Sequence, residues 1–268
     1  MVLAADYTHV LLQHGWRNLD VNPLLGGVRP LAADFQRVYG DANLMGVINI
    51  ASSVNRGLYD ELAVHFERRF SATTSLQTNY TLASARGMGG ALDGALRNAS
   101  APPQTASATG GDIYAAVDSG PTGYDERHRV TLAGVFNLPF GFDVSPSMTA
   151  ASARPYTRIN RANPSGDGSL QLKGADGNPL GIGNARGLPL FNINARVTKN
   201  FSFSPNRKVG VFIEMYNLTN RANFGNAIGA NAAAPATYGL PTGYLGGIGA
   251  VSTIPNSFQT QFGARYSF

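Results

Sequence analysis

The segment Ser257-Phe-Gln-Thr-Gln-Phe-Gly-Ala-Arg-Tyr-Ser-Phe268 alternates between two kinds of side chain. One set of alternate positions holds Phe258, Thr260, Phe262, Ala264, Tyr266 and Phe268. The other set holds Ser257, Gln259, Gln261, Gly263, Arg265 and Ser267. Successive side chains of a β-strand point to opposite faces of its sheet. The segment therefore predicts a strand with one apolar and one polar face.

The same period of two recurs along the chain, and Leu190–Phe203 is the next clearest example, with Lys199 as the one charged residue on its apolar side. No comparably long segment has a helical period of 3.6. Eight strands are predicted, at residues 2–13, 57–70, 72–85, 126–138, 142–154, 189–203, 207–219 and 257–268. Each is about 11 to 15 residues long, whereas strands of globular domains average about 5 or 6 and a tilted strand needs about 9 to 11 to cross a bilayer.

The connections between these strands alternate between short and long. Short turns are predicted at Ser71, at Pro139-Phe140-Gly141 and at Ser204-Pro205-Asn206. The long connections are residues 14–56, 86–125, 155–188 and 220–256, and we interpret them as exposed loops. Bacterial outer-membrane barrels have this asymmetry, with short periplasmic turns and long extracellular loops. The pattern favours an all-β fold, an antiparallel up-and-down transmembrane β-barrel segment.

Residues 44–54, within the first long connection, resemble a further strand. A ninth spanning strand would disturb the alternation of upward and downward strands. We therefore expect residues 44–54 to be one half of an extracellular hairpin that projects beyond the bilayer.

Composition excludes several classes of protein. The 268 residues include no Cys, so disulfides, thiolate metal sites and cysteine nucleophiles are excluded. Charged residues make up 14% of the chain, against about 25% in soluble domains. The net charge of +5 comes from scattered Lys and Arg, so no nucleic-acid partner is expected. Met1–Val10 has no basic region and contains Asp6, so we expect no signal peptide.

Catalytic chemistry finds no support in the sequence. His9, His14, His65 and His128 have no metal-binding spacing, and no nucleophile-elbow motif is present. The glycine-rich run at Gly181-Ile182-Gly183 joins no strand to a helix, so a phosphate-binding loop is not expected there. We expect no catalytic residue, no metal and no cofactor, and hence no enzyme.

If the apolar faces contact lipid, the polar faces line a lumen. The charges predicted to face the lumen are Glu61, Glu67, Arg69, Arg129, Arg196, Lys208, Glu214 and Arg265. They could contact a ligand or a plug, but solvation and mutual pairing explain them better. Aromatic residues near predicted strand ends are expected to form belts at the membrane interfaces. These residues are Tyr80, Phe140, Phe142, Phe201, Phe203 and Tyr266.

Three blocks of sequence resemble TonB-dependent receptors. The first contains Tyr59–Val64 and Asn79-Tyr80-Thr81, the second runs from Asp125-Glu126-Arg127-His128-Arg129 to Leu138-Pro139-Phe140-Gly141, and the third is Phe212–Phe224. The similarity is greatest to the Oar-like branch, whose members carry a carboxypeptidase-regulatory-like domain at the N-terminus. The aromatic end of the chain also resembles the C-terminal signal that outer-membrane assembly machinery recognises, here Phe262, Tyr266 and Phe268.

The resemblance implies the cell outer membrane of a Gram-negative bacterium and a barrel of about 22 strands closed around a plug. Residues 1–268 resemble only the C-terminal part of such a barrel, with no plug domain and no TonB box. In the intact parent the protein would take up a ligand too large for porins. The implied partners are membrane lipid, the assembly machinery, the plug domain and the remaining barrel strands, with TonB engaged only through the N-terminal part.

Two alternatives remain open at this stage. One is a soluble or cell-surface β-sandwich for carbohydrate binding or adhesion, which would cover the apolar faces with a second sheet. The other is a self-contained eight-stranded barrel, in which residues 2–13 would pair with residues 257–268. A curved open sheet with two free edges would favour the receptor fragment.

Overall fold

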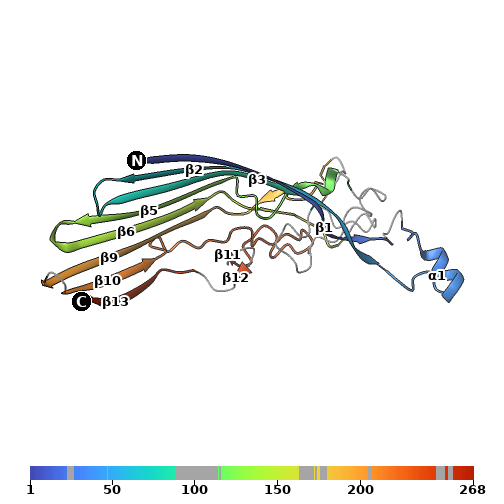
Figure 1. The fold of residues 1–268 in the computed structure, drawn as a ribbon. Helices are drawn as coiled ribbons and strands as arrows, with labels where there is room; N and C mark the ends of the chain where they lie inside the picture. The colour runs from blue at the N-terminus through green and yellow to red at the C-terminus, as the bar shows by residue number, and fades with distance from the viewer. Residues whose placement is uncertain are drawn as a thin grey trace.

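The computed structural model describes all of the chain except residues 23–26, 47, 89–113, 115, 163–171, 173, 176–179, 205–206, 246–250 and 253–255. Its main feature is one antiparallel sheet in the order β1-β2-β3-β5-β6-β9-β10-β13, with β4 paired to β3 (Figure 1). The strands are β1 Val2–Asp20, β2 Asn49–Arg69, β3 Ser75–Gly87, β4 Gly120–Pro121, β5 His128–Leu138, β6 Phe142–Ala151, β9 Leu190–Ser204, β10 Arg207–Tyr216 and β13 Gln259–Ser267.

All eight predicted long strands are present, so the all-β prediction is confirmed. Most of their bounds differ by one to three residues from the expected ones, but β1 and β2 extend much further at the loop end. The strand predicted at residues 44–54 is present in part as one half of a hairpin, but it is not a separate element. Its described part from Asn49 onward is the outer end of β2, and it pairs with the outer end of β1 up to Asp20. Irregular pairing around Gly15 lets the two strands continue together as the expected hairpin.

The short turns and the long connections lie at opposite ends of the sheet, as predicted. Figure 1 shows both chain termini at the end with the short turns. The β2–β3 turn is wider than the single residue expected, because the Phe70 N–H donates to the Thr74 carbonyl. The second turn is the 3-10 helix η3, Pro139–Gly141, in which Phe140 has a φ of 65°. Residues 205–206 of the third turn lie outside the described residues.

The described parts of the long connections contain more regular structure than the exposed loops that were expected. They contain the helix α1 Ala32–Tyr39, the 3-10 helix η2 Ala116–Asp118, the pair β7 Pro155–Tyr156 with β8 Ala185–Arg186, and the pair β11 Tyr244–Leu245 with β12 Val251–Ser252. Their side chains Ile159, Ile182 and Ala227 are buried. Glycine makes this packing possible: the backbone of Gly187 approaches the Gly225 carbonyl so closely that a Cβ would not fit.

In the described part of the chain the extensive contacts of each long strand are with its neighbours in the sheet. No second sheet and no helix packs across the apolar face in that part. None of the described helices is long and apolar enough to cross a membrane. The buried side chains lie instead at the loop end, where β1 to β6 meet the long connections.

Candidate functional site

The strand register defines the polar face of the sheet. Directly opposite residues of antiparallel strands share a face. One such row runs from Arg196 through Glu214 to Gln261, and a second runs from Glu67 through Gln77 toward β9. Following the register through every pair places all eight charges predicted to face the lumen on this one face.

Some of these charges are paired on the polar face. Arg196 lies 3.3 Å from Glu214, and its guanidinium stacks 3.8 Å from the centroid of the Phe212 ring. Arg69 lies 3.2 Å from Glu67. Pairing agrees with the interpretation of these groups as ordinary charges of a polar surface.

Lys208 and Arg265 lie at the turn end of the same face. Neither has a carboxylate within 4 Å among the described residues. These two cations are the groups on this face that remain available to an anionic partner.

The opposite face is apolar and uncovered. Phe262 is 75% exposed and Tyr266 is 55% exposed, although both belong to regular strand. Five of the six expected belt aromatics lie at the turn end, and Tyr80 lies further toward the loops, where its hydroxyl contacts His128 Nδ1 at 2.8 Å. Lys199, the charged exception on this face, reaches down to the Phe140 carbonyl and lies 4.6 Å from the Phe142 ring centroid. Its charge thereby leaves the apolar band.

A polar cluster interrupts the apolar face on β1 and β2. Asp60 accepts a hydrogen bond of 2.7 Å from the Tyr7 hydroxyl and lies 2.7 Å from His9 Nδ1. Because β2 begins at Asn49, Asp60 lies in the interior of the strand and not at its end. The cluster lies instead about ten residues from the turn, which is the length that crosses a bilayer at a tilt. It marks the upper edge of the apolar band.

Asp125 is the centre of a buried network at the loop end that sequence reasoning missed. Its side chain is fully buried and accepts a 2.9 Å hydrogen bond from the Ala85 N–H of β3. Arg186 donates to it at 2.5 Å, and Arg127 lies 3.6 Å away. Arg186 also donates to the Ala153 carbonyl. Asp125 therefore ties the sheet to two long connections.

Three further ion pairs stabilise the same region. Glu126 bridges Arg129 and Arg154, each at 2.7 Å. Arg17 on β1 lies 3.0 Å from Asp118 of η2, and both side chains are almost completely buried. The sequence signal for this network is the cluster of two acidic and two basic residues between Asp125 and Arg129.

Buried asparagine side chains form hydrogen bonds with backbone groups of the loops. Asn217 is fully buried and donates to the carbonyls of Arg221 and Asn256. Asn223 accepts from the Phe191 N–H and donates to its carbonyl, and so acts as an extra strand partner for β9. A buried backbone needs such partners, which explains why these connections are rich in Asn.

The loop end also contains an apolar hollow of about 200 Å³ on the polar side of the sheet, lined in part by Val10, Leu12, Tyr59 and Tyr124. Among the described residues no group of three or more His, Asp or Glu side chains could hold a metal ion. The arrangement offers hydrogen bonds, cations and aromatic surfaces to a ligand.

These features define a transmembrane sheet with lipid on one face. Residues 1–150 match the family model of the outer membrane beta barrel domain, which covers β1 to β6. The chain belongs to that family, and its location is the outer membrane. A comparison with curated proteins gave no match, and a comparison with solved structures gave none either.

Proposed function

We propose that residues 1–268 form the C-terminal part of the barrel of a TonB-dependent receptor, which imports a ligand too large for porins in the intact parent. The observation that carries this proposal is the open sheet. Among the described residues β1 pairs only with β2, and β13 pairs only with β10. The three sequence blocks that begin near Tyr59, Asp125 and Phe212 resemble such receptors, and this resemblance is the reason for proposing this family of barrels.

Free edges are costly in a membrane. Hydrocarbon offers no hydrogen-bond partner, so each unpaired backbone group within it destabilises the sheet by several kcal/mol. The outer edges of β1 and β13 must therefore be paired by other strands when the sheet lies in the bilayer. In a receptor these strands are the remainder of the barrel.

The polar face and the loop end suit such a receptor. A wide barrel needs a polar interior that faces water or a plug. The two polar rows, one through Arg196 and Glu214 and the other through Glu67 and Gln77, provide such a surface. The tied connections around Asp125 provide a preorganised extracellular surface for first contact with a ligand. Nothing in this proposal requires chemistry on the ligand, so we propose transport without catalysis.

The soluble sandwich has less support than the receptor. It requires a second sheet over Phe262 and Tyr266, and the described part of the chain contains none. The self-contained eight-stranded barrel requires pairing of β1 with β13. Among the described residues these two strands are instead the unpaired edges of the sheet.

Cysteine cross-linking in outer membranes tests closure directly, since the chain has no native Cys. Val211 and Ala264 face each other across β10 and β13, so V211C/A264C is the positive control and should form a disulfide. We expect no intramolecular disulfide when Ala264→Cys is combined in turn with L3C, A5C or Y7C. Efficient β1–β13 cross-linking would establish the self-contained barrel and overturn the receptor proposal.

The parent itself provides the second test. An antibody against this chain should detect, in outer membranes of the native host, a protein much larger than 28.3 kDa. Deletion of TonB should abolish uptake of its ligand. A band at the size of this chain alone, with uptake unchanged without TonB, would contradict the proposal.

A further inference from the structure

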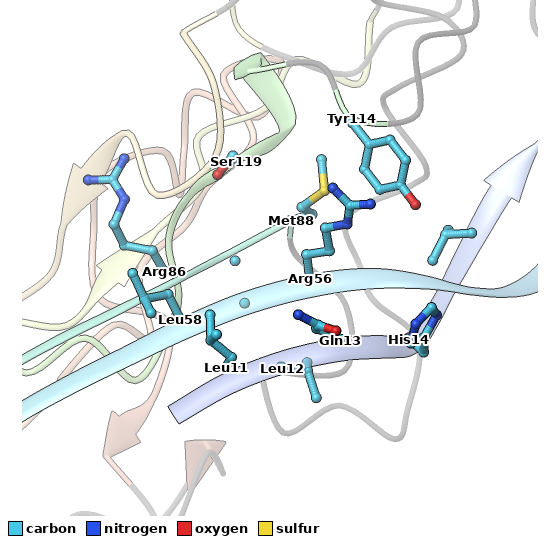
Figure 2. A pocket seen from close by; sticks show the side chains of 13 residues that line it. Leu11, Leu12, Gln13, His14, Arg56, Leu58, Arg86, Met88, Tyr114 and Ser119 are labelled. Atoms are coloured by element: carbon cyan, nitrogen blue, oxygen red, sulfur yellow. The ribbon is translucent and has the colours of Figure 1, made fainter. Parts of the chain in front are cut away.

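A cavity of about 610 Å³ lies beside the outer parts of β1, β2 and β3 (Figure 2). Leu58 on β2 faces Leu11 on one side and Arg86 on the other, so these three side chains share a face. That face is the apolar one, because Leu62 and Val64 follow at even spacing along the same strand. Tyr114 and Ser119 close the cavity from the connection after β3. The cavity thus opens on the outside of the sheet and not on its polar interior side.

The height of the cavity places it beside lipid headgroups. The Tyr7–His9–Asp60 cluster marks the upper edge of the apolar band. Leu58 is two residues further along β2, which is about 7 Å along a strand and less along the membrane normal because strands of these barrels tilt. The headgroup region of each leaflet is about 5 to 7 Å deep. Leu11 and Leu58 therefore lie where hydrocarbon gives way to headgroups.

Two arginines give the cavity a positive charge. Arg56 and Arg86 both line it, and Figure 2 shows them on neighbouring strands. Neither has a carboxylate within 4 Å in the described part of the chain. Arg17, by contrast, is close by in β1 and is paired with Asp118.

The other lining groups fit an anion with an apolar tail. The guanidinium of Arg56 lies 4.0 Å from the centroid of the Tyr114 ring, which restricts its orientation. Ser119 and Gln13 add hydrogen-bond donors to the lining. Leu11 and Leu58 continue toward the apolar band below.

We propose that this cavity binds the phosphate of a phosphorylated lipid in the outer leaflet of the outer membrane. Guanidinium groups bind phosphate oxygens in pairs of parallel hydrogen bonds, and basic pockets at this depth of membrane proteins bind lipid headgroups. A lipid fits better than a soluble anion, because the cavity adjoins the lipid-facing surface and has leucines on its membrane side. The lipid would fix the outer hairpin of β1 and β2 against the membrane surface.

The experiment measures lipid bound to the full chain after extraction from outer membranes in mild detergent. The probe is diphosphoryl lipid A, counted by native mass spectrometry. We expect R56Q/R86Q to bind about tenfold less than wild type, since loss of one charge-assisted hydrogen bond is enough for that change. R56K/R86K keeps the charge but loses the planar fork, so its binding should lie between the two.

The matched control is R161Q/R221Q, which removes the same charge from two exposed arginines elsewhere in the long connections. It should bind within about twofold of wild type, because salt screens distant charges. Equal binding by wild type and R56Q/R86Q, or an equal loss in the control, would overturn the proposal.

Two further measurements use the wild-type chain, so their outcome does not depend on whether a variant folds. Lipid A stripped of its phosphates should bind about tenfold less than the diphosphoryl form, for the same reason. Millimolar inorganic phosphate should leave bound lipid A in place. Equal binding of the stripped lipid would show that phosphate is not recognised, and displacement by inorganic phosphate would show a soluble anion site in place of a lipid site.

Discussion

The half of the sheet that carries the short turns, here called the turn half, differs from the loop end in the kind of side chain that is buried. In the turn half apolar side chains such as Phe203 and Phe262 are exposed, and that part of the described chain has no buried side chain. At the loop end the fully buried side chains are mostly polar, among them Asn55, Asp118 and Asp125. Lipid covers the first region, whereas the second must satisfy its own polar groups.

The difference shows where each region gets its stability. The turn half depends on backbone pairing and on transfer of its outer face into hydrocarbon, so it tolerates changes on its polar face. The loop end depends on a polar network in which each member satisfies another. Such a network stabilises when complete and is strongly weakened by the loss of one member.

The largest expected effect is at the centre of that network. Asp125→Ala leaves the Ala85 N–H without its acceptor and Arg186 without its carboxylate, a loss of about 3 kcal/mol or more. We expect protease added to intact cells to cut the extracellular connections readily, while the membrane-embedded strands stay protected. Asp125→Asn keeps one acceptor and should be cut more slowly. Resistance of Asp125→Ala equal to wild type would show that the loop end does not rely on this network.

The next effect tests the two faces of one strand. Phe262→Arg places a charge on the lipid-facing side near the middle of β13 and should destabilise the folded sheet by about 2 kcal/mol or more. Gln261→Arg changes the neighbouring residue on the polar face and should reduce the stability of the folded sheet only slightly. The urea midpoint of the embedded protein measures both. A greater loss for Gln261→Arg would mean that the faces are assigned the wrong way round.

A smaller effect is expected where an aromatic ring covers a glycine. The Phe212 ring lies over Gly263 on the polar face, and a Cβ there would collide with it. Gly263→Ala should cost about 1 to 3 kcal/mol through displacement of the ring, and it should also disturb the stacking of Arg196. Gly210→Ala on the adjacent strand meets only flexible side-chain atoms and serves as the comparison. Urea midpoints that do not separate the two variants would argue against a close ring contact.

The smallest effect concerns an exposed ion pair at the turn end. Arg69 is 78% exposed beside Glu67, and such pairs contribute about 0 to 1 kcal/mol. Arg69→Gln should therefore leave the urea midpoint almost unchanged, in contrast to Asp125→Ala. A loss as large as that of Phe262→Arg would place Arg69 in a tighter environment than its exposure indicates.

Sequence reasoning predicted the turn half better than the loop end. The period of two located β9 and β13 within two residues, because side-chain alternation along a strand is a local property. It could not show that the described parts of residues 155–188 pack against residues 220–245, because the two segments are distant in sequence. The charges of Asp125 and Glu126 were visible, but their partners Arg154 and Arg186 become neighbours only when the connections fold back.

The alternation along the chain by itself determined the strands, their two faces, the long and short connections and the apolar band. These features follow from local geometry, since every second side chain points the same way. The tertiary structure alone decided that the sheet has two unpaired edges, that Asp125 is buried beneath the loops, and that Arg56 and Arg86 line one cavity. Each of these depends on which distant segments come together, and register across strands, not composition along them, decides that.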